Sequence, residues 1–262
     1  MCITVEEAIM NQTITGVLVD YLKKTHTLFY QNAAENIHDG PNALILPILG
    51  AVIGEAIDTT PFNKCLNDIV SFFEVRTRGG LSKGLSKGIA IYECGAYTVI
   101  HAKDASLKGI EKALQSIQPN KRPNISRELS EWYQTYYSKP ELLICCFDGS
   151  EMTEVQPIMI EYVPRDFNKV FIPGADSHDG TVPRMGKQRV SRDHKIIFGT
   201  IGDGPKFGQQ VKFSQTTAET VAMERATWEV INYPFNGINC DWQFEFEEKN
   251  QRWSGLQDLV LA

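Results

Sequence analysis

The sequence lacks the cysteine spacings that mark a disulfide framework or a metal site. No two of its six cysteines form a C-x-x-C pair or any other paired spacing. Cys145 and Cys146 are adjacent on a predicted strand, where neighbouring side chains point to opposite faces and are poorly placed to bridge each other. We therefore expect reduced thiols.

The sequence also lacks the features of a secretory leader and of a membrane span. Glu6 and Glu7 stand where a signal peptide carries lysine or arginine. The longest apolar run, residues 43–57, is interrupted by Pro47 and by glycines, whereas a span needs roughly 20 apolar residues. These absences, together with the reduced thiols, predict a cytoplasmic protein without a membrane span.

Charge of one sign is in only small excess. The 262 residues include 26 Lys and Arg against 32 Asp and Glu, which gives a formal net charge of −6. This balance argues against wholesale nucleic-acid binding and leaves room for a local basic patch. A hydrophobic content of 42% and a charged content of 22% are ordinary for a globular protein.

A recognisable phosphate-binding loop is missing as well. Residues 80–87 repeat the motif GLSK, but a Walker loop needs G-x-x-x-x-G-K-[ST] between a strand and a helix. Two interpretations of the repeat remain open. It is a flexible linker, or its backbone N–H and ammonium groups hold an anion.

What the sequence does contain is a regular succession of elements. Residues 5–24 carry apolar side chains at helical spacing, which predicts an amphipathic helix. We expect residues 1–78 to form an N-terminal helical segment, residues 79–88 a linker, and residues 89–262 an α+β sheet domain. One continuous domain is the alternative.

The remaining elements alternate between strands and helices. Apolar and β-branched runs predict strands at residues 142–147, 157–163, 195–199 and 242–247. Helical spacing predicts helices at residues 61–73, 105–117, 126–138 and 216–233, the last introduced by a capping box from Thr216 to Glu219. The fold class expected is α+β, with antiparallel sheets covered by helices and an N-terminal helical segment.

The strongest functional candidate by composition is the polar, glycine-containing stretch at residues 173–208. Between Arg184 and Lys195 there are five Lys or Arg against one Asp, in a chain that is acidic as a whole. Long polar loops on rigid scaffolds often carry binding residues, although a solvated surface loop has the same composition. The residues expected to bind an anion or a partner are Arg184, Lys187, Arg189, Arg192, His194 and Lys195.

Two weaker patterns concern metal binding and catalysis. Asp176-Ser-His178-Asp179 resembles part of a 2-His-1-carboxylate set, which would need a second histidine such as His194 or His101. With five histidines in the chain, such a match arises by chance, so we expect neither a metal nor another cofactor. Cys2 becomes a candidate nucleophile if Met1 is removed, because the free α-amine can then act as its general base.

One stretch of the chain resembles a known family. From residue 141 to residue 247 the order of elements is similar to the second half of proteasome-type subunits of the N-terminal-nucleophile hydrolase superfamily. The matching features are a strand ending at Asp148-Gly149, a strand at 157–164, a turn at 199–204, a capped helix at 217–233 and a final strand at 237–246.

The resemblance implies a four-layer αββα sandwich. The family's N-terminal threonine, aspartate and lysine have no counterpart in residues 1–80, so no catalytic residue carries over. We therefore expect a non-catalytic binding or self-assembly protein that uses residues 173–208 to contact an anionic partner or a neighbouring subunit. The partner is another protein or a second copy of the chain. An amide-bond hydrolase of the N-terminal-nucleophile type is the alternative.

Overall fold

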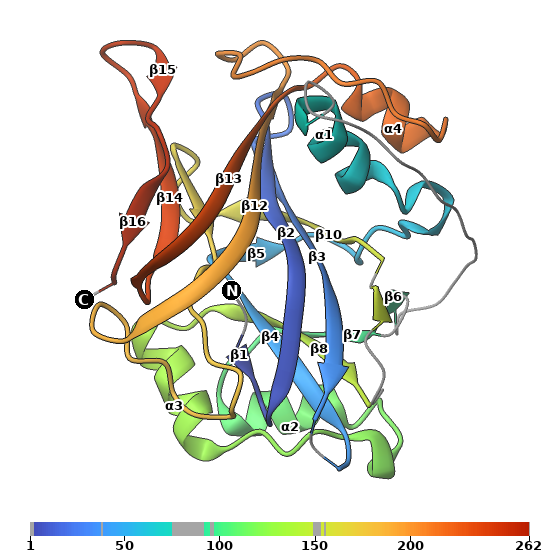
Figure 1. Cartoon of the computed structure of the whole chain (residues 1–262), viewed down its shortest axis with the longest axis vertical. Helices are drawn as coiled ribbons and strands as arrows, with labels where there is room; N and C mark the ends of the chain where they lie inside the picture. Colours follow the sequence, from blue (N-terminus) through green and yellow to red (C-terminus); the bar gives the residue numbers. More distant parts are fainter. Residues whose placement is uncertain are drawn as a thin grey trace.

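A seven-stranded sheet forms the middle of the molecule (Figure 1). The computed structural model describes residues 3–37, 39–74, 92–94, 97–148, 153–154 and 156–261. The sheet has the order β13 (Thr227–Ile238), β12 (Arg189–Ile201), β2 (Ala8–Asp20), β3 (Thr25–Asn36), β10 (Ile158–Pro164) and β5 (Gly50–Val52), with β9 (Thr153–Glu154) also paired to β3. Strands β2 and β12 are parallel, and the other pairs are antiparallel.

Two smaller antiparallel sheets flank this one. The five-stranded sheet has the order β1 (Ile3–Thr4), β4 (Asn42–Ile48), β8 (Glu141–Phe147), β7 (Tyr97–Ala102) and β6 (Tyr92–Cys94). The four-stranded sheet contains β11 (Lys169–Ile172), β14 (Asp241–Glu247), β15 (Arg252–Trp253) and β16 (Gln257–Leu259).

The helices are short, and serine or threonine side chains cap three of them. They are η1 (Thr60–Phe62), α1 (Cys65–Glu74), α2 (Leu107–Leu114), η3 (Pro119–Lys121), α3 (Arg127–Tyr136) and α4 (Ala218–Met223). The hydroxyls of Ser106 and Ser126 accept the N–H groups of Gly109 and Leu129 at the starts of α2 and α3. None of the helices within the described ranges combines the length and the apolar character that a bilayer crossing requires.

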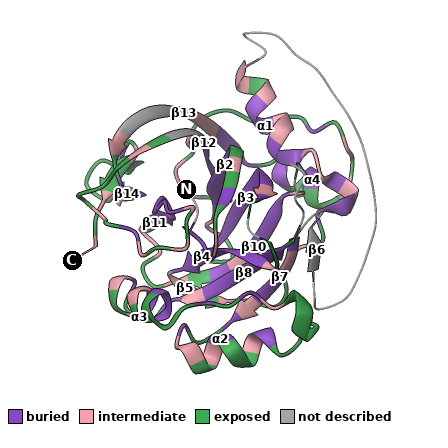
Figure 2. Ribbon diagram, turned by 60° about the horizontal axis from the view of Figure 1, so that its bottom comes forward, coloured by how far each residue is buried: buried purple, intermediate pink, exposed green. Residues whose placement is uncertain are grey.

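Three apolar clusters hold these layers together. The largest contains side chains from all three sheets, including Val17, Leu143 and Trp242, and therefore lies between them. A second cluster joins α2 and α3 to the five-stranded sheet, and a third joins α1 and α4 to the seven-stranded sheet. Figure 2 shows the result as buried strands with exposed residues on the outer sides of α2 and α3.

The coarse prediction of antiparallel sheets in a mixed α and β chain is confirmed. The described residues form three sheets and short helices, so the plain four-layer αββα sandwich does not describe this fold. Strands from both sides of residues 79–88 share two sheets: β4 lies between β1 and β8, and β2 pairs with β12. The division into domains at residues 79–88, with one continuous domain as its alternative, stays a prediction. The predicted linker at 79–88 lies outside the described residues.

The predicted N-terminal helical segment is wrong. Residues 8–20 and 25–36 form the strands β2 and β3. Most of the second half of β2 is buried, since Val17 and Val19 belong to the cluster between the sheets and Leu18 faces α1. A strand covered on both faces is almost continuously apolar, so it contains residues at helical spacing by coincidence.

The helix predicted at 216–233 ends early. Only Ala218–Met223 is helical, with Thr217 and Thr220 forming the capping box, and Thr227–Ile238 is the edge strand β13. Trp228 is fully buried, lies 5.7 Å from the Phe29 ring, and donates its indole N–H to the carbonyl of Met223. Tertiary burial of this aromatic residue in a strand outweighs the local helical spacing.

Candidate partner-binding surface

The stretch at residues 173–208 is not one loop. A connection at 173–188 follows β11, the strand β12 occupies Arg189–Ile201, and a second connection at 202–217 leads to α4. The basic residues found in the sequence therefore fall on a turn and on a strand. The exposure and the contacts of these basic residues therefore differ.

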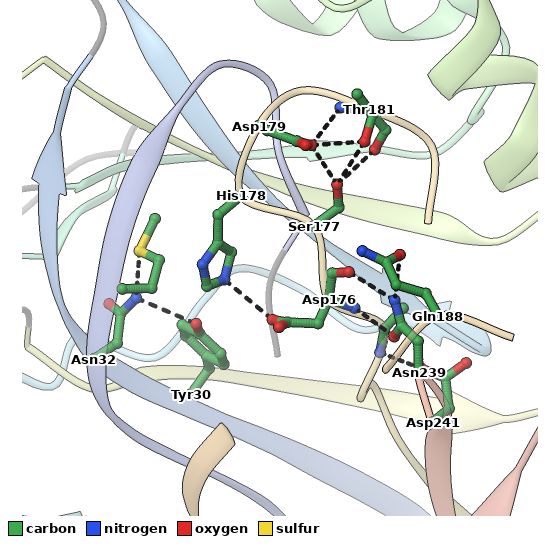
Figure 3. A network of polar contacts seen from close by, with 12 residues as sticks. Tyr30, Asn32, Asp176, Ser177, His178, Asp179, Thr181, Gln188, Asn239 and Asp241 are labelled. Atoms are coloured by element: carbon green, nitrogen blue, oxygen red, sulfur yellow. Dashed lines mark hydrogen bonds and ion pairs between the residues drawn. The ribbon is translucent and has the colours of Figure 1, made fainter. Parts of the chain in front are cut away.

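The first connection is fixed to the body by two fully buried polar side chains (Figure 3). Asp241 accepts the backbone N–H groups of Gly174 at 2.7 Å and Ala175 at 3.0 Å. Asn239 accepts the N–H of Asp176 at 2.9 Å and donates to its carbonyl at 2.7 Å. Because each contact is made to the main chain, these two side chains fix the path of the connection itself.

A tyrosine contacts one of these two side chains. We call Asn239, Asp241 and Tyr137 the anchor. The Tyr137 hydroxyl, on the residue that ends α3, donates to Asp241 at 3.3 Å. Burial, and secondarily the negative charge of Asp241, raise the pKa of this hydroxyl well above its ordinary value, so it stays protonated and donates. The anchor therefore links the connection at 173–188, the strand β14 and the helix α3.

Three of the predicted cations lie on the surface next to this anchor. Residues 184–188 form a turn in which the N–H groups of Lys187 and Gln188 donate to the carbonyl of Arg184. Gly186 donates to the carbonyl of Asn239 at 2.7 Å and has a φ of +70°, a backbone conformation that glycine adopts readily. Arg184, Lys187 and Arg189 are all exposed. We call these three residues the basic turn.

The turn leads into a two-stranded ribbon. Residues 189–193 of β12 pair with β13, whereas pairing with β2 begins only at His194. Figure 1 shows β12 and β13 curving together away from α1 toward the lower left. The backbone of Arg192 lies in this ribbon, but its side chain is outside the described residues.

His194 and Lys195 are separated from the basic turn and from each other. His194 is buried, and its ring lies 6.0 Å from the Trp242 ring. Lys195 Nζ lies 2.6 Å from a carboxylate oxygen of Glu74 in α1. Because consecutive residues of a strand point to opposite faces, the two side chains cannot contribute to one patch.

The polar residues at 176–181 do not combine into a nucleophilic triad. His178 Nε2 lies 3.1 Å from Asp176 Oδ1, whereas Ser177 Oγ lies 2.9 Å from Asp179 Oδ1 and contacts Thr181 (Figure 3). The serine and the histidine thus have different partners and point apart. The hydroxyl and N–H of Thr181 lower the pKa of Asp179, as expected for a carboxylate that organises a turn.

Asp176 is held in its ionised form although it is buried. Burial opposes its ionisation, but positive charges beside it, that of His178 among them, and the hydrogen bond from His178 keep its pKa well below the ordinary value. Within the described ranges, no three His, Cys, Asp or Glu side chains are placed to hold a metal ion. Asp176 and His178 contact each other, and the absence of a metal stays an expectation.

No protein-family model and no curated protein matches the chain. Solved structures do resemble its fold. The crystal structure of baculovirus P35 aligns with a TM-score of 0.50 and 15% identity, over 99% of this chain and 94% of that chain. Two structures of a mutated baculovirus P35 after caspase cleavage align with TM-scores of 0.44 and 0.43, at 14% identity, over 96% of this chain and 93% and 94% of theirs.

The fold similarity to baculovirus P35 overturns the predicted resemblance to proteasome-type subunits. That resemblance needed a helix at 217–233, after the turn at 199–204, and a final strand at 237–246. In the structure the turn follows the end of β12. Residues 227–238 then form the strand β13, which pairs antiparallel with β12. The segment interpreted as one helix therefore contains the short helix α4 followed by β13, a strand that pairs with β12.

The sequence predicts a binding role for the three cations of the basic turn, which stays a prediction, and it does not predict the anchor. Asn239 and Asp241 look like ordinary polar residues beside a strand, and only the fold brings them to the connection at 173–188. In the sequence they are marked only by their position on either side of Cys240, where β13 ends and β14 begins. Cys2, the candidate nucleophile, lies outside the described residues, and the rest of the predicted set stays a prediction.

Proposed function

We propose that the protein is a non-catalytic binding protein whose partner is a protease. The observation that carries this proposal is the fold similarity to baculovirus P35 over 99% of the chain. A mutated form of P35 has been crystallised after caspase cleavage, so P35 is a protein on which a caspase acts. A chain with this fold over its whole length is suited to meet a protease in a comparable way.

The basic turn supplies a contact surface for an acidic partner within this proposal. Arg184, Lys187 and Arg189 are exposed on a turn whose backbone is held by Asn239. A surface that is already ordered loses little conformational entropy on binding. Cations at the rim of an interface steer the approach of an acidic surface and make association sensitive to salt.

We also propose that the protein is located in the cytoplasm. Cys65 and Cys146 are free thiols within the apolar interior, where Cys145 and Cys240 are buried as well. Burial raises the pKa of Cys146 to about 12, so this thiol stays protonated and unreactive. Such cysteines suit a reducing compartment.

The proposal is tested with a panel of proteases that includes caspases. Purified full-length protein is incubated with each protease, residual activity is measured on a peptide substrate, and complex formation is followed by native mass spectrometry. We expect at least one protease to be retained in a complex and to lose activity. If every protease remains free and fully active, and the protein elutes only as self-associated copies, the partner is a second copy and the protease proposal is wrong.

The basic turn is tested by replacing Arg184, Lys187 and Arg189 together with alanine. We expect association to weaken about tenfold at low salt, mainly through a slower on-rate, because rim charges act on encounter. The matched control replaces the exposed residues Lys103, Lys108 and Lys121 with alanine, which removes the same charge elsewhere. Equal weakening in both triple variants would mean that net charge, and not this turn, governs binding.

A further inference from the structure

A row of apolar side chains leads across the surface from α3 to the basic turn. Trp132 and Tyr136 lie one helical turn apart on α3, and their rings stack with centroids 5.0 Å apart and an interplanar angle of 9°. The Tyr136 hydroxyl accepts the backbone N–H of Leu261 at 3.0 Å. A Cβ added at Gly186 would lie 3.4 Å from a methyl carbon of Val260. The segment that follows β16 therefore connects α3 to the turn that precedes β12 (Figure 1). We call Trp132, Tyr136, Val260 and Leu261 the apolar strip.

The backbone beneath the apolar strip is ordered. The strand β16 pairs with β14, where Leu259 lies opposite Asp241. The side chains of Trp132, Tyr136 and Leu261 pack against the cluster that joins α2 and α3 to the five-stranded sheet. Because these contacts fix the strip before any partner arrives, little conformational entropy is lost on binding.

Each member of the apolar strip keeps part of its surface in water. Val260 is 44% exposed, and Trp132, Tyr136 and Leu261 are partly buried. Tryptophan and tyrosine, together with arginine, are the side chains that contribute most to the affinity of protein interfaces. Insertion into a bilayer instead needs apolar side chains that project from the surface. The partly buried strip therefore suits a protein that lies across it.

Two cations beside the apolar strip are available to a partner. Arg184 and Lys187 are exposed, and within the described part of the chain neither their guanidinium nor their ammonium group contacts a carboxylate. The strip itself carries no charge. A wholly acidic partner would leave the strip in water, and a wholly apolar partner would cover two cations without pairing them. The complementary partner therefore combines carboxylates with an apolar side chain.

We propose that the basic turn and the apolar strip form one docking surface for an acidic protein segment that carries a large apolar side chain among its carboxylates. The apolar side chain packs against Val260 and the rings of α3, and the carboxylates pair with Arg184 and Lys187. This inference rests on the proposed function in taking the basic turn as the contact surface. It adds the apolar half of that surface and the chemistry of the segment that it binds.

The probe is the peptide Asp-Glu-Phe-Glu-Asp, blocked at both ends and titrated into the full-length protein at low salt. Trp132 is the reporter, because the other three tryptophans of the chain are buried. We expect saturable protection of Trp132 fluorescence from acrylamide with a Kd of about 1 mM. High salt should weaken this binding. The same peptide with alanine in place of phenylalanine should bind about tenfold more weakly, because the apolar contact is lost.

A pair of valines with equal exposure tests the apolar half of the surface. Val260→Asn should weaken binding of the phenylalanine peptide about threefold, because apolar contact area is lost. Val221 on α4 is also 44% exposed, so Val221→Asn is the matched control and should leave the affinity unchanged. Urea unfolding of both variants establishes that they are folded.

Paired charge removals test the basic half of the surface. Replacing Arg184 and Lys187 together with alanine should weaken the peptide about tenfold at low salt. Replacing the exposed Lys103 and Lys108 with alanine removes the same charge elsewhere and should have a much smaller effect. Equal weakening by the two pairs would contradict a role for the basic turn.

Four further results would overturn the inference. They are the absence of saturable protection, equal affinity for the alanine peptide, equal effects of Val260→Asn and Val221→Asn, and stronger protection of Trp132 by vesicles of phosphatidylserine and phosphatidylcholine than by the peptide. The last result would indicate a membrane surface in place of a protein. If Val260→Asn fails to fold, the two peptides titrated into the wild type still decide.

The outcome of this titration is separate from that of the protease panel. A protease that binds while the peptide does not would use another surface, so the proposed function would stand without this inference. A peptide that binds while every protease stays free would show the docking surface to serve another protein.

Discussion

His26 illustrates how single polar side chains are placed in this interior. Its ring is fully buried, Nε2 lies 3.2 Å from the carbonyl of Phe167, and the rings of Tyr162 and Phe167 pack against it. Burial lowers the pKa of His26 to about 4, against a smaller opposing effect of the hydrogen bond to Phe167. The folded protein therefore holds a neutral imidazole at neutral and mildly acidic pH.

A neutral buried histidine makes stability depend on pH. Between the ordinary pKa of 6.5 and the folded value of about 4, the unfolded chain binds a proton at this position and the folded chain does not. The free energy of unfolding should therefore fall by roughly 3 kcal/mol as the pH drops through this window. Above the ordinary pKa of 6.5, His26 should add no further pH dependence.

The measurement is urea unfolding at a series of pH values for the wild type and His26→Gln. The variant should lose this part of the pH dependence, while all other titrating groups contribute equally to both proteins. Parallel loss of stability on acidification in the two proteins would show that His26 is not neutral in the folded state.

At the scale of elements, the parallel pair of β2 and β12 contains a close approach between the two backbones. Gly16 lies opposite Ile197, and a Cβ added at Gly16 would stand 1.8 Å from the Ile197 carbonyl oxygen. Only a residue without a side chain permits this approach. The pair joins a strand made early in the chain to one made late.

Gly16→Ala should therefore lower the free energy of unfolding by about 3 kcal/mol, because β2 or β12 must move. Gly255→Ala is the matched control, since a Cβ there meets nothing within 4 Å, and its effect should stay within about 0.5 kcal/mol. Both values come from denaturant unfolding. A small effect at Gly16 would mean that the two strands separate at little cost.

Local elements could be predicted where sequence and environment agree. Strands at β8, β10 and β12 are predicted from apolar runs, and β14 from aromatic residues that alternate with polar ones. The helices α2 and α3 are predicted because their apolar spacing and caps coincide. The strand β2 was missed because it is covered on both faces. The anchor of the basic turn was missed because Asn239 and Asp241 act only through contacts with residues 174–176.

At the scale of the whole molecule, the sheets interleave early and late parts of the chain. In the five-stranded sheet β4 has β8 as a neighbour, and in the seven-stranded sheet β3 pairs with β10. The cluster between the sheets accordingly contains residues from Ala8 to Trp253. In the described residues, this cluster is built from both parts of the chain.

A fragment of residues 97–262 should therefore fail to fold alone. It keeps β8, β10 and β12 but loses β4 beside β8, both neighbours of β10, and β2 beside β12, so their apolar faces stay open to water. Far-ultraviolet circular dichroism and urea unfolding of the fragment, compared with the full chain, test this. A cooperative transition in the fragment would support separate domains at 1–78 and 89–262.

The interleaving has a consequence for biosynthesis. The strand β2 leaves the ribosome long before β12, and at about 5–20 residues per second the interval is on the order of ten seconds or more. During that time the valines and leucines of β2 and β3 have no late-made neighbours to cover them. Until the late strands are made, the apolar side chains of β2 and β3 stay exposed to water, and exposed apolar surface of this kind promotes aggregation.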